Sequence, residues 1–197
     1  MKHRIAPIVE GQGEVEAVPI LLRRVWTELL AASGLEVLKP VRQPRLRLAR
    51  ADHLMKAVAL ALLKLGGAGG LVLLLIDNDP AEEPPCELAP TLTRIVREAR
   101  SDADFACVLA NPEYETWFAA AADSLRDAAE LPQIPQDVEA ARMKKAWVQR
   151  HLRSNYSPTV DQPALTSRMD LSLCRRRSAS FDKLCRELEA FRRRRGD

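Results

Sequence analysis

Six carboxylates follow three short hydrophobic segments of the chain, with two acids after each segment. They are Glu10 and Glu14, Asp77 and Asp79, and Glu113 and Glu115. Carboxylates that are brought together repel one another unless a cation neutralises them, and Mg²⁺ or Mn²⁺ is the usual partner of an all-oxygen site. If the three segments end at one place in the fold, the sequence predicts a Mg²⁺ or Mn²⁺ site there.

Hydrophobic runs that indicate strands alternate with segments of helical spacing. The expected strands are residues 4–9, 35–41, 71–76 and 105–109. The expected helices are residues 18–30, 51–65 and 88–99, and a fourth that starts with Asn111 as N-cap and Pro112 as first residue. This order predicts an α/β fold, a Rossmann-like parallel sheet of about four strands flanked by helices. Sites in such a sheet form at the carboxyl ends of the strands, where the six acids lie.

Pro132 and Pro135 mark the end of the alternation. We expect an α/β core at residues 1–131 and a mainly helical, basic extension at residues 132–197, with helices at 137–151 and 182–191. Residues 142–197 carry 15 Lys and Arg against 6 Asp and Glu, a net charge of +9, whereas residues 1–141 carry −6. An acidic front half and a basic tail suit a carboxylate metal site beside a polyanion-binding surface.

Basic residues in three clusters are the candidates for contacts with nucleic-acid phosphates. They are Arg42, Arg45 and Arg47, then Lys144 and Lys145, and finally Arg175, Arg176 and Arg177. A solvated basic face is the alternative for each cluster, and the last three arginines could instead cap a helix or pair with Asp170 or Asp182. No aromatic residue is interleaved with these clusters, so base-specific readout is not supported.

Each acidic pair also has a structural interpretation. Glu10 and Glu113 could interact with the dipole of a following helix, and the sequence Asp77-Asn78-Asp79-Pro80 is good turn chemistry. The segment Gly11-Gln12-Gly13 lacks the third glycine of a dinucleotide-binding loop. The pair Trp117-Phe118 suits a core position better than a base-stacking platform.

Composition excludes several classes of protein. Hydrophobic residues make up 47% of the 197 residues and charged residues 29%, as in globular proteins. The uncharged window at residues 65–76 is far shorter than the roughly 20 residues of a membrane span, and no signal-peptide core precedes Glu10. The four cysteines have no C-x-x-C spacing, so we expect reduced thiols in a cytoplasmic protein without a membrane partner.

The acidic motifs resemble those of a known family. Val9-Glu10-Gly11 with Glu14, followed by a hydrophobic strand that ends Asp77-x-Asp79, resembles the two signatures of the Toprim domain of topoisomerases, primases and overcoming-lysogenization-defect (OLD) nucleases. The later segments Asn111-Pro112-Glu113-x-Glu115-x-Trp117-Phe118 and Arg177-Ser178-x-Ser180-Phe181 are similar to those of a Toprim-like prokaryotic family of unknown function, which often accompanies ATPase genes in settings that look like phage defence.

The resemblance implies metal-dependent phosphoryl transfer, with a Toprim-like core. Glu10 would match the Toprim glutamate, a metal ligand or general acid/base, and Asp77 and Asp79 would match its metal-binding aspartates. Glu14 would match the second acid of the OLD-type motif, and Glu113 and Glu115 the smaller family's own motif. The expected function is a divalent-metal-dependent nuclease acting on nucleic acid. The alternative is a non-catalytic Toprim-like module that binds an ATPase partner.

Overall fold

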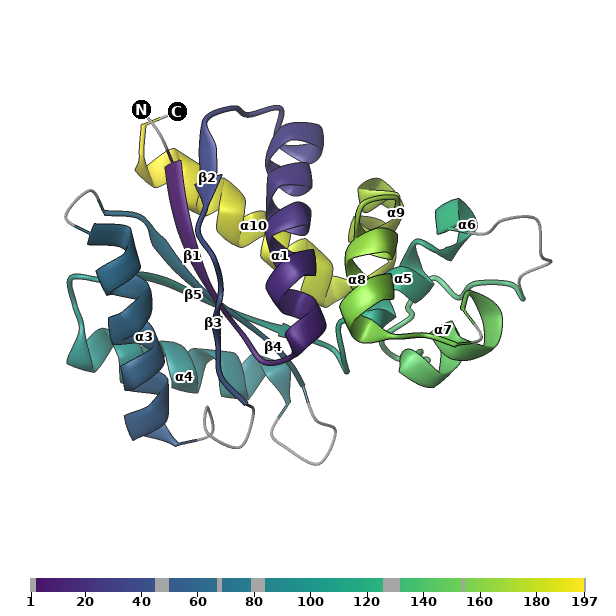
Figure 1. Cartoon of the computed structure of the whole chain (residues 1–197), viewed down its shortest axis with the longest axis horizontal. Coiled ribbons are helices and arrows are strands. Elements are labelled where there is room, and N and C mark those ends of the chain that lie inside the picture. The colour runs from purple at the N-terminus through teal and green to yellow at the C-terminus, as the bar shows by residue number, and fades with distance from the viewer. Residues whose placement is uncertain are drawn as a thin grey trace.

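A five-stranded sheet, in which every described strand pair is parallel, forms the centre of the molecule (Figure 1). The computed structural model describes residues 3–44, 50–66, 69–78, 84–125, 132–153 and 155–196. The strands are β1 (His3–Val9), β2 (Leu35–Val37), β3 (Val41–Arg42), β4 (Leu71–Asp77) and β5 (Asp104–Ala110). Their order is β2-β1-β4-β5, and β3 pairs with the end of β1. The predicted parallel α/β sheet is therefore confirmed.

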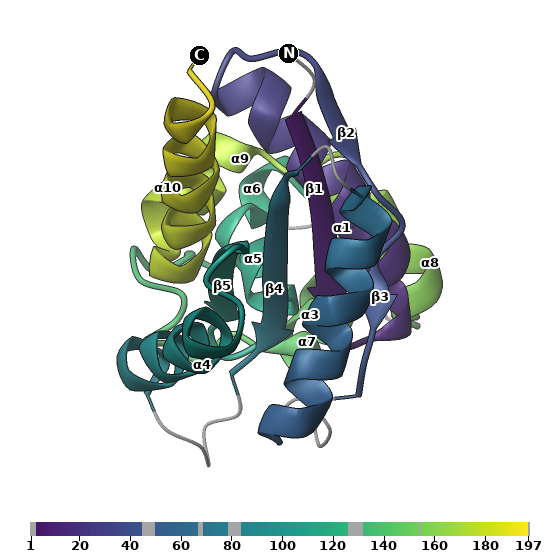
Figure 2. The same cartoon turned by 90° about the vertical axis from the view of Figure 1, so that its left-hand side faces the viewer.

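Helices cover both faces of the sheet because successive side chains of each strand point to opposite faces. They are α1 (Gln12–Arg24), α3 (Ala51–Leu65), α4 (Pro85–Ala99) and α10 (Ala179–Arg194). Val72, Leu74 and Ile76 of β4 pack in the cluster with α3 and α4, the helices nearest the viewer in Figure 2. Leu71, Leu73 and Leu75 pack in the opposite cluster with α1 and α10.

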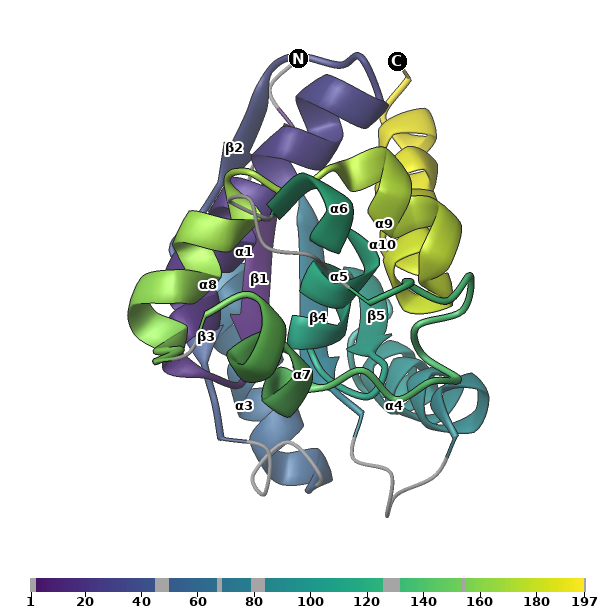
Figure 3. The same cartoon turned by 90° about the vertical axis from the view of Figure 1, so that its right-hand side faces the viewer.

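Smaller helices extend this second cluster away from the sheet, on the side that Figure 3 shows. They are α5 (Glu115–Ala120), α6 (Ala122–Leu125), α7 (Lys145–His151), α8 (Pro158–Thr166) and α9 (Leu171–Arg177). Residues beyond 131, such as Leu165 and Leu184, belong to the same buried cluster as Leu73. The predicted extension thus shares a core with the sheet, and the division of the chain at residue 131 stays a prediction. Among the described residues, no helix is long and apolar enough to cross a membrane.

Two predicted elements are interrupted. Residues 35–41 form two short strands separated by Pro40, which has no N–H to donate to a ladder. The helix predicted at residues 137–151 is wrong in its first half, because the Asp137 side chain accepts hydrogen bonds from the N–H groups of Glu139 and Ala140 and stabilises a turn instead. The helix at this place is α7 alone.

The helix after β5 begins later than predicted. Asn111 is not its N-cap, because α5 starts at Glu115 and Tyr114 is the residue that precedes it. The residue just before this helix is held by a side chain of β4, because the Tyr114 N–H donates a hydrogen bond to Asp77 Oδ1 at 2.8 Å. The start of α5 is thus fixed by a long-range contact that local sequence does not encode.

Gly13 allows the close approach of α8 to the first turn of α1. A Cβ atom at Gly13 would collide with Gln162 Oε1 and with the carbonyl oxygen of Pro158. We expect Gly13→Ala to lower the free energy of unfolding by about 1–3 kcal/mol, because the two helices must separate. Urea unfolding measures this, with Gly11→Ala as the control, since its Cβ would meet only the Glu14 side chain. Equal losses in both variants would contradict this interpretation of the contact.

Candidate metal centre

Three of the predicted acids meet where β4 and β5 end. Asp77 is the last residue of β4, Glu113 follows β5, and Glu115 is the first residue of α5. One carboxylate oxygen from each residue lies within 4.8 Å of the others. Three carboxylates at this spacing form a donor set that suits a hard divalent cation.

The alternation of β4 explains why Asp77 points into this cluster. Leu71, Leu73 and Leu75 face α1 and α10, so Asp77 continues the same face beyond the last of them. Burial, followed by the charges of Glu14, Glu115 and Glu10, raises the pKa of the Asp77 carboxyl well above its ordinary value, although the Tyr114 N–H opposes the shift.

Glu10 and Glu14 join the same cluster from the end of β1 and the start of α1. The Glu10 N–H donates to Glu14 Oε2 at 3.0 Å. Glu14 is only 5% exposed, and burial is the main reason that its pKa rises to about 7. The charges of Glu10 and Glu115 raise this pKa further, whereas hydrogen bonds from the backbone lower it. Five predicted acids therefore lie at one end of the sheet.

Backbone and side-chain donors hold Glu113 and Glu115 in place. Glu113 Oε1 accepts a hydrogen bond from the Lys145 N–H at the start of α7, and Gln162 Nε2 of α8 donates to Glu115 Oε1 at 3.4 Å. Glu115 is 5% exposed, and burial raises its pKa. The Tyr156 hydroxyl lies near the same carboxylate, whose charge adds to burial in raising the pKa of Tyr156.

These supporting residues were not among the sequence candidates. Gln162 and Tyr156 are more than 40 positions from Glu115 along the chain, and no local spacing connects them. The sequence analysis assigned no element to the segment of Gln162, which the structure shows to be α8. Lys145 was predicted as a phosphate contact, and the structure shows that its backbone N–H also serves the acidic cluster.

The comparisons with known proteins place the chain in a family without an assigned activity. A sequence model of the family described as "Domain of unknown function (DUF4276)" matches residues 9–189. The chain belongs to this DUF4276 family. The matched range includes all six predicted acids. No curated protein matches the chain.

One solved structure is similar to the DUF4276 chain. It is the C-terminal region of the Burkholderia pseudomallei OLD protein, at 15% sequence identity and a TM-score of 0.43, with 98% of each chain covered.

The remaining candidates of the DUF4276 chain differ in their surroundings. Asp79, Arg45 and Arg47 lie outside the described residues. Arg42 is exposed at the end of β3, and Lys144 precedes α7.

The three consecutive arginines at the end of α9 do not share one environment. Arg175 pairs with Asp182 at 2.9 Å and with Glu189 at 2.8 Å. Arg177 Nη1 pairs with Asp123 at 2.6 Å and donates to the Ala120 carbonyl oxygen at 3.0 Å. Arg176 is exposed. Two of the three arginines thus make contacts within the chain, and Arg176 is the one that is most accessible to a polyanion.

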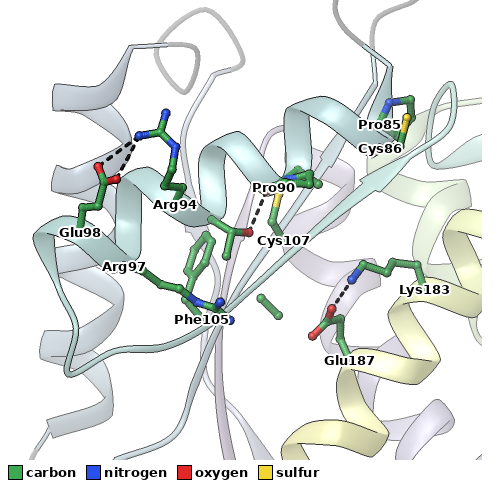
Figure 4. A pocket seen from close by; sticks show the side chains of 13 residues that line it. Pro85, Cys86, Pro90, Arg94, Arg97, Glu98, Phe105, Cys107, Lys183 and Glu187 are labelled. Carbon is green, nitrogen blue, oxygen red and sulfur yellow. Dashed lines mark hydrogen bonds and ion pairs between the residues drawn. The ribbon is translucent and has the colours of Figure 1, made fainter.

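A groove of about 620 Å³ is lined by residues of α4, β5 and α10 (Figure 4). Its ionic side chains include Arg94, which pairs with Glu98, and Lys183, which pairs with Glu187. None of the six predicted acids is among its described lining residues. The acidic cluster at the ends of β4 and β5 therefore does not line the described part of this groove.

The raised pKa values predict how the stability of the metal-free protein depends on pH. A carboxyl group with a higher pKa in the folded chain than in the unfolded chain contributes stability below its ordinary pKa, and this contribution is lost as the pH rises through the folded value. For Glu14 the window runs from 4.5 to about 7. We expect the melting temperature in chelator to fall between about pH 5 and pH 8, and Glu14→Gln to flatten this fall.

Differential scanning calorimetry at several pH values measures the effect. Saturating Mn²⁺ at pH 8 should raise the melting temperature, because an ion that binds only the folded state stabilises it. A melting temperature that is constant or rises over this range in chelator contradicts the assignment of a crowded acidic site.

The contacts of Arg177 and the exposure of Arg176 predict different effects of their replacement. Arg177→Ala should lower the free energy of unfolding by about 1 kcal/mol, since a buried carbonyl and Asp123 lose their donor. Arg176→Ala should change stability by less than about 0.5 kcal/mol and should reduce the salt slope of duplex DNA binding by about 0.9. Urea unfolding and binding at several salt concentrations measure both. An unchanged slope would exclude Arg176 as a phosphate contact.

Proposed function

We propose that this protein is a Toprim-like, divalent-metal-dependent nuclease or a related phosphoryl-transfer protein that acts on nucleic acid. The supporting observation is the approach of Asp77, Glu113 and Glu115 within 4.8 Å at the carboxyl ends of parallel strands. The acidic motifs that resemble the Toprim signatures supply two members of the surrounding cluster, Glu10 and Glu14. Buried carboxylates with raised pKa values gain most from a nearby cation, so the donor set fits Mg²⁺ or Mn²⁺.

Each acidic residue has a role in this proposal. Asp77, Glu113 and Glu115 hold the ion, with Glu10 and the predicted ligand Asp79 as further oxygen donors. A bound Mg²⁺ or Mn²⁺ supplies Lewis-acid polarisation of a phosphodiester and an activated water. Glu14 is suited to hold or accept a proton near neutral pH, because its pKa rises to about 7.

The basic residues have the role of positioning the polyanion. Arg42, Lys144 and Arg176 are the described candidates that make this contact in the proposal, together with the predicted Arg45 and Arg47. Lys145 starts α7 beside the acidic cluster, and its ammonium group lies 5.8 Å from the centre of the Tyr156 ring. Phosphate contacts of this kind give sequence-independent affinity.

A second candidate function is a non-catalytic module that binds an ATPase partner. The observation that favours it is that two of the acids stabilise the fold. The Asp77 carboxylate accepts a hydrogen bond from the Tyr114 N–H, and the Glu113 carboxylate accepts one from the Lys145 N–H. If the carboxylates serve only to connect segments of the chain, they are compatible with a protein that catalyses no reaction. The two candidates differ in what replacement of Asp77 by its amide does, because asparagine keeps an acceptor oxygen and loses the charge.

We expect Asp77→Asn to reduce Mg²⁺- or Mn²⁺-dependent cleavage at least about 100-fold, because a metal ligand loses its charge. Cleavage of labelled single- and double-stranded DNA and RNA measures this effect. Glu16→Gln is the matched control, since Glu16 is exposed on α1 two residues after Glu14. Clean inertness of the wild type on all four substrates, together with tight association with an ATPase, would support the module instead.

A further inference from the structure

A basic segment without any acidic residue adjoins the acidic cluster. Residues 142–151 contain four Lys and Arg and no Asp or Glu, and they form the end of a turn and the whole of α7. The Lys145 N–H of this segment donates to Glu113 Oε1, so its first residues contact the candidate metal centre. A polyanion that reaches the acidic cluster from this side therefore meets a surface of opposite charge.

Three cations of this segment are available to a ligand. Arg142 and Arg150 are exposed, and Lys144 is half-buried. Their side chains make no ion pair or hydrogen bond with the other described residues. Arg175 and Arg177 differ from them, because acids of the chain already pair with these two arginines. The segment thus carries positive charge that no described acid of the chain neutralises.

Two aromatic rings stack on the same segment. The ring centroids of Trp147 and His151 lie 4.6 Å apart, the ring planes are inclined by 30°, and both residues are half-buried. Trp147 packs against the buried cluster that includes Val148, and His151 Nδ1 donates to the Trp147 carbonyl oxygen at 3.0 Å. These contacts fix the two rings before any ligand binds, so a ligand loses little affinity in ordering them.

The aromatic pair and two of the cations lie on one side of α7. Residues three or four positions apart are neighbours on a helix, so Arg150 and His151 lie beside Trp147. Lys144 is the N-cap of α7, and its carbonyl oxygen accepts the Trp147 N–H at 2.7 Å. The expectation that no aromatic residue accompanies the basic clusters is wrong here, since Trp147 follows Lys145 by two positions.

We propose that residues 142–151 bind single-stranded nucleic acid and lead it to the metal centre. The Trp147–His151 pair contacts an unpaired base, and the cations beside the pair, Lys144 and Arg150, contact phosphates. Aromatic rings bind unpaired bases of any sequence because every base has a flat π-face, whereas bases inside a duplex are covered by their neighbours. This inference rests on the proposed nuclease function and specifies its substrate class.

The test compares three labelled ligands of equal length. They are an oligothymidine of about 12 nucleotides, a fully abasic strand and a duplex. Ca²⁺ replaces Mg²⁺, and a gel checks that the strands stay intact. We expect the wild type to bind the oligothymidine about 10-fold more tightly than the abasic strand, and more tightly than the duplex, since only the oligothymidine offers free bases to the rings.

Variants of α7 separate the base contact from a folding defect. Trp147→Ala and His151→Ala should bind the oligothymidine and the abasic strand equally, whereas Trp147→Phe should keep part of the preference because the phenyl ring is also flat. Gln149→Ala is the control on the same helix, since Gln149 is exposed and lies outside the pair. The melting temperature of each variant identifies a folding defect. If Trp147→Ala does not fold, the comparison with His151→Ala decides.

A second pair of variants tests the phosphate contacts. Arg150→Ala should weaken the oligothymidine and the abasic strand by the same factor and reduce the salt slope by about 0.7. Arg193→Ala is the charge-matched control and should change neither property. Arg193 is exposed near the end of α10, at the opposite end of the molecule from α7 (Figure 1 and Figure 3).

The outcomes distinguish this inference from the proposed function. If Mn²⁺ raises the melting temperature and nucleic acid is cleaved, but the wild type binds the abasic strand as tightly as the oligothymidine or prefers the duplex, only the inference is overturned. A preference that persists in folded Trp147→Ala and His151→Ala overturns it as well, because the base then lies elsewhere. If no strand binds and none is cleaved, both the proposed function and this inference are overturned.

Discussion

The partial burial of several carboxylates at the end of the sheet, together with their mutual repulsion, is the constraint on which the site depends. Glu14 is buried and Asp77 is half-buried, and the pKa of each is raised by burial and by the charges of Glu10 and Glu115. Backbone N–H groups of Glu10, Tyr114 and Lys145 offset part of this cost by donating to the acids. A bound cation would remove the remaining repulsion between the carboxylates, so its binding would stabilise the folded protein.

The segment after residue 131 completes the surroundings of these acids. Gln162 of α8 reaches Glu115 because Gly13 lets α8 approach α1 without a side chain between them. The Trp117 indole N–H donates to Ser180 Oγ at 2.9 Å, which connects α5 to the first turn of α10. The basic extension at residues 132–197 is therefore part of the structure that positions the site, as well as a candidate surface for a polyanion.

The sequence predicted those strands and helices whose hydrophobic residues recur with a regular local spacing. The continuous apolar run formed the predicted strand β4, and Asp77, Glu113 and Glu115 lie together because parallel strands end at one edge of a sheet. The start of α5, the turn at residues 138–142 and the ion pair of Arg175 with Glu189 were not predicted, whereas the pairing of Arg175 with Asp182 was one of the alternatives that the sequence left open. The start of α5 and the Glu189 pair depend on partners that meet only in the folded chain, Asp77 with Tyr114 and Glu189 with Arg175. The turn depends on the local side chain of Asp137, which competes with the helical spacing of the same segment.

A crystal of this protein soaked in Mn²⁺ tests the central claim most directly, because anomalous scattering locates the ion. The account predicts one strong peak about 2.0–2.3 Å from carboxylate oxygens of Asp77, Glu113 and Glu115, and loss of this peak in Asp77→Asn. Peaks only at other places on the surface, or no peak among these three residues at saturating Mn²⁺, would contradict it.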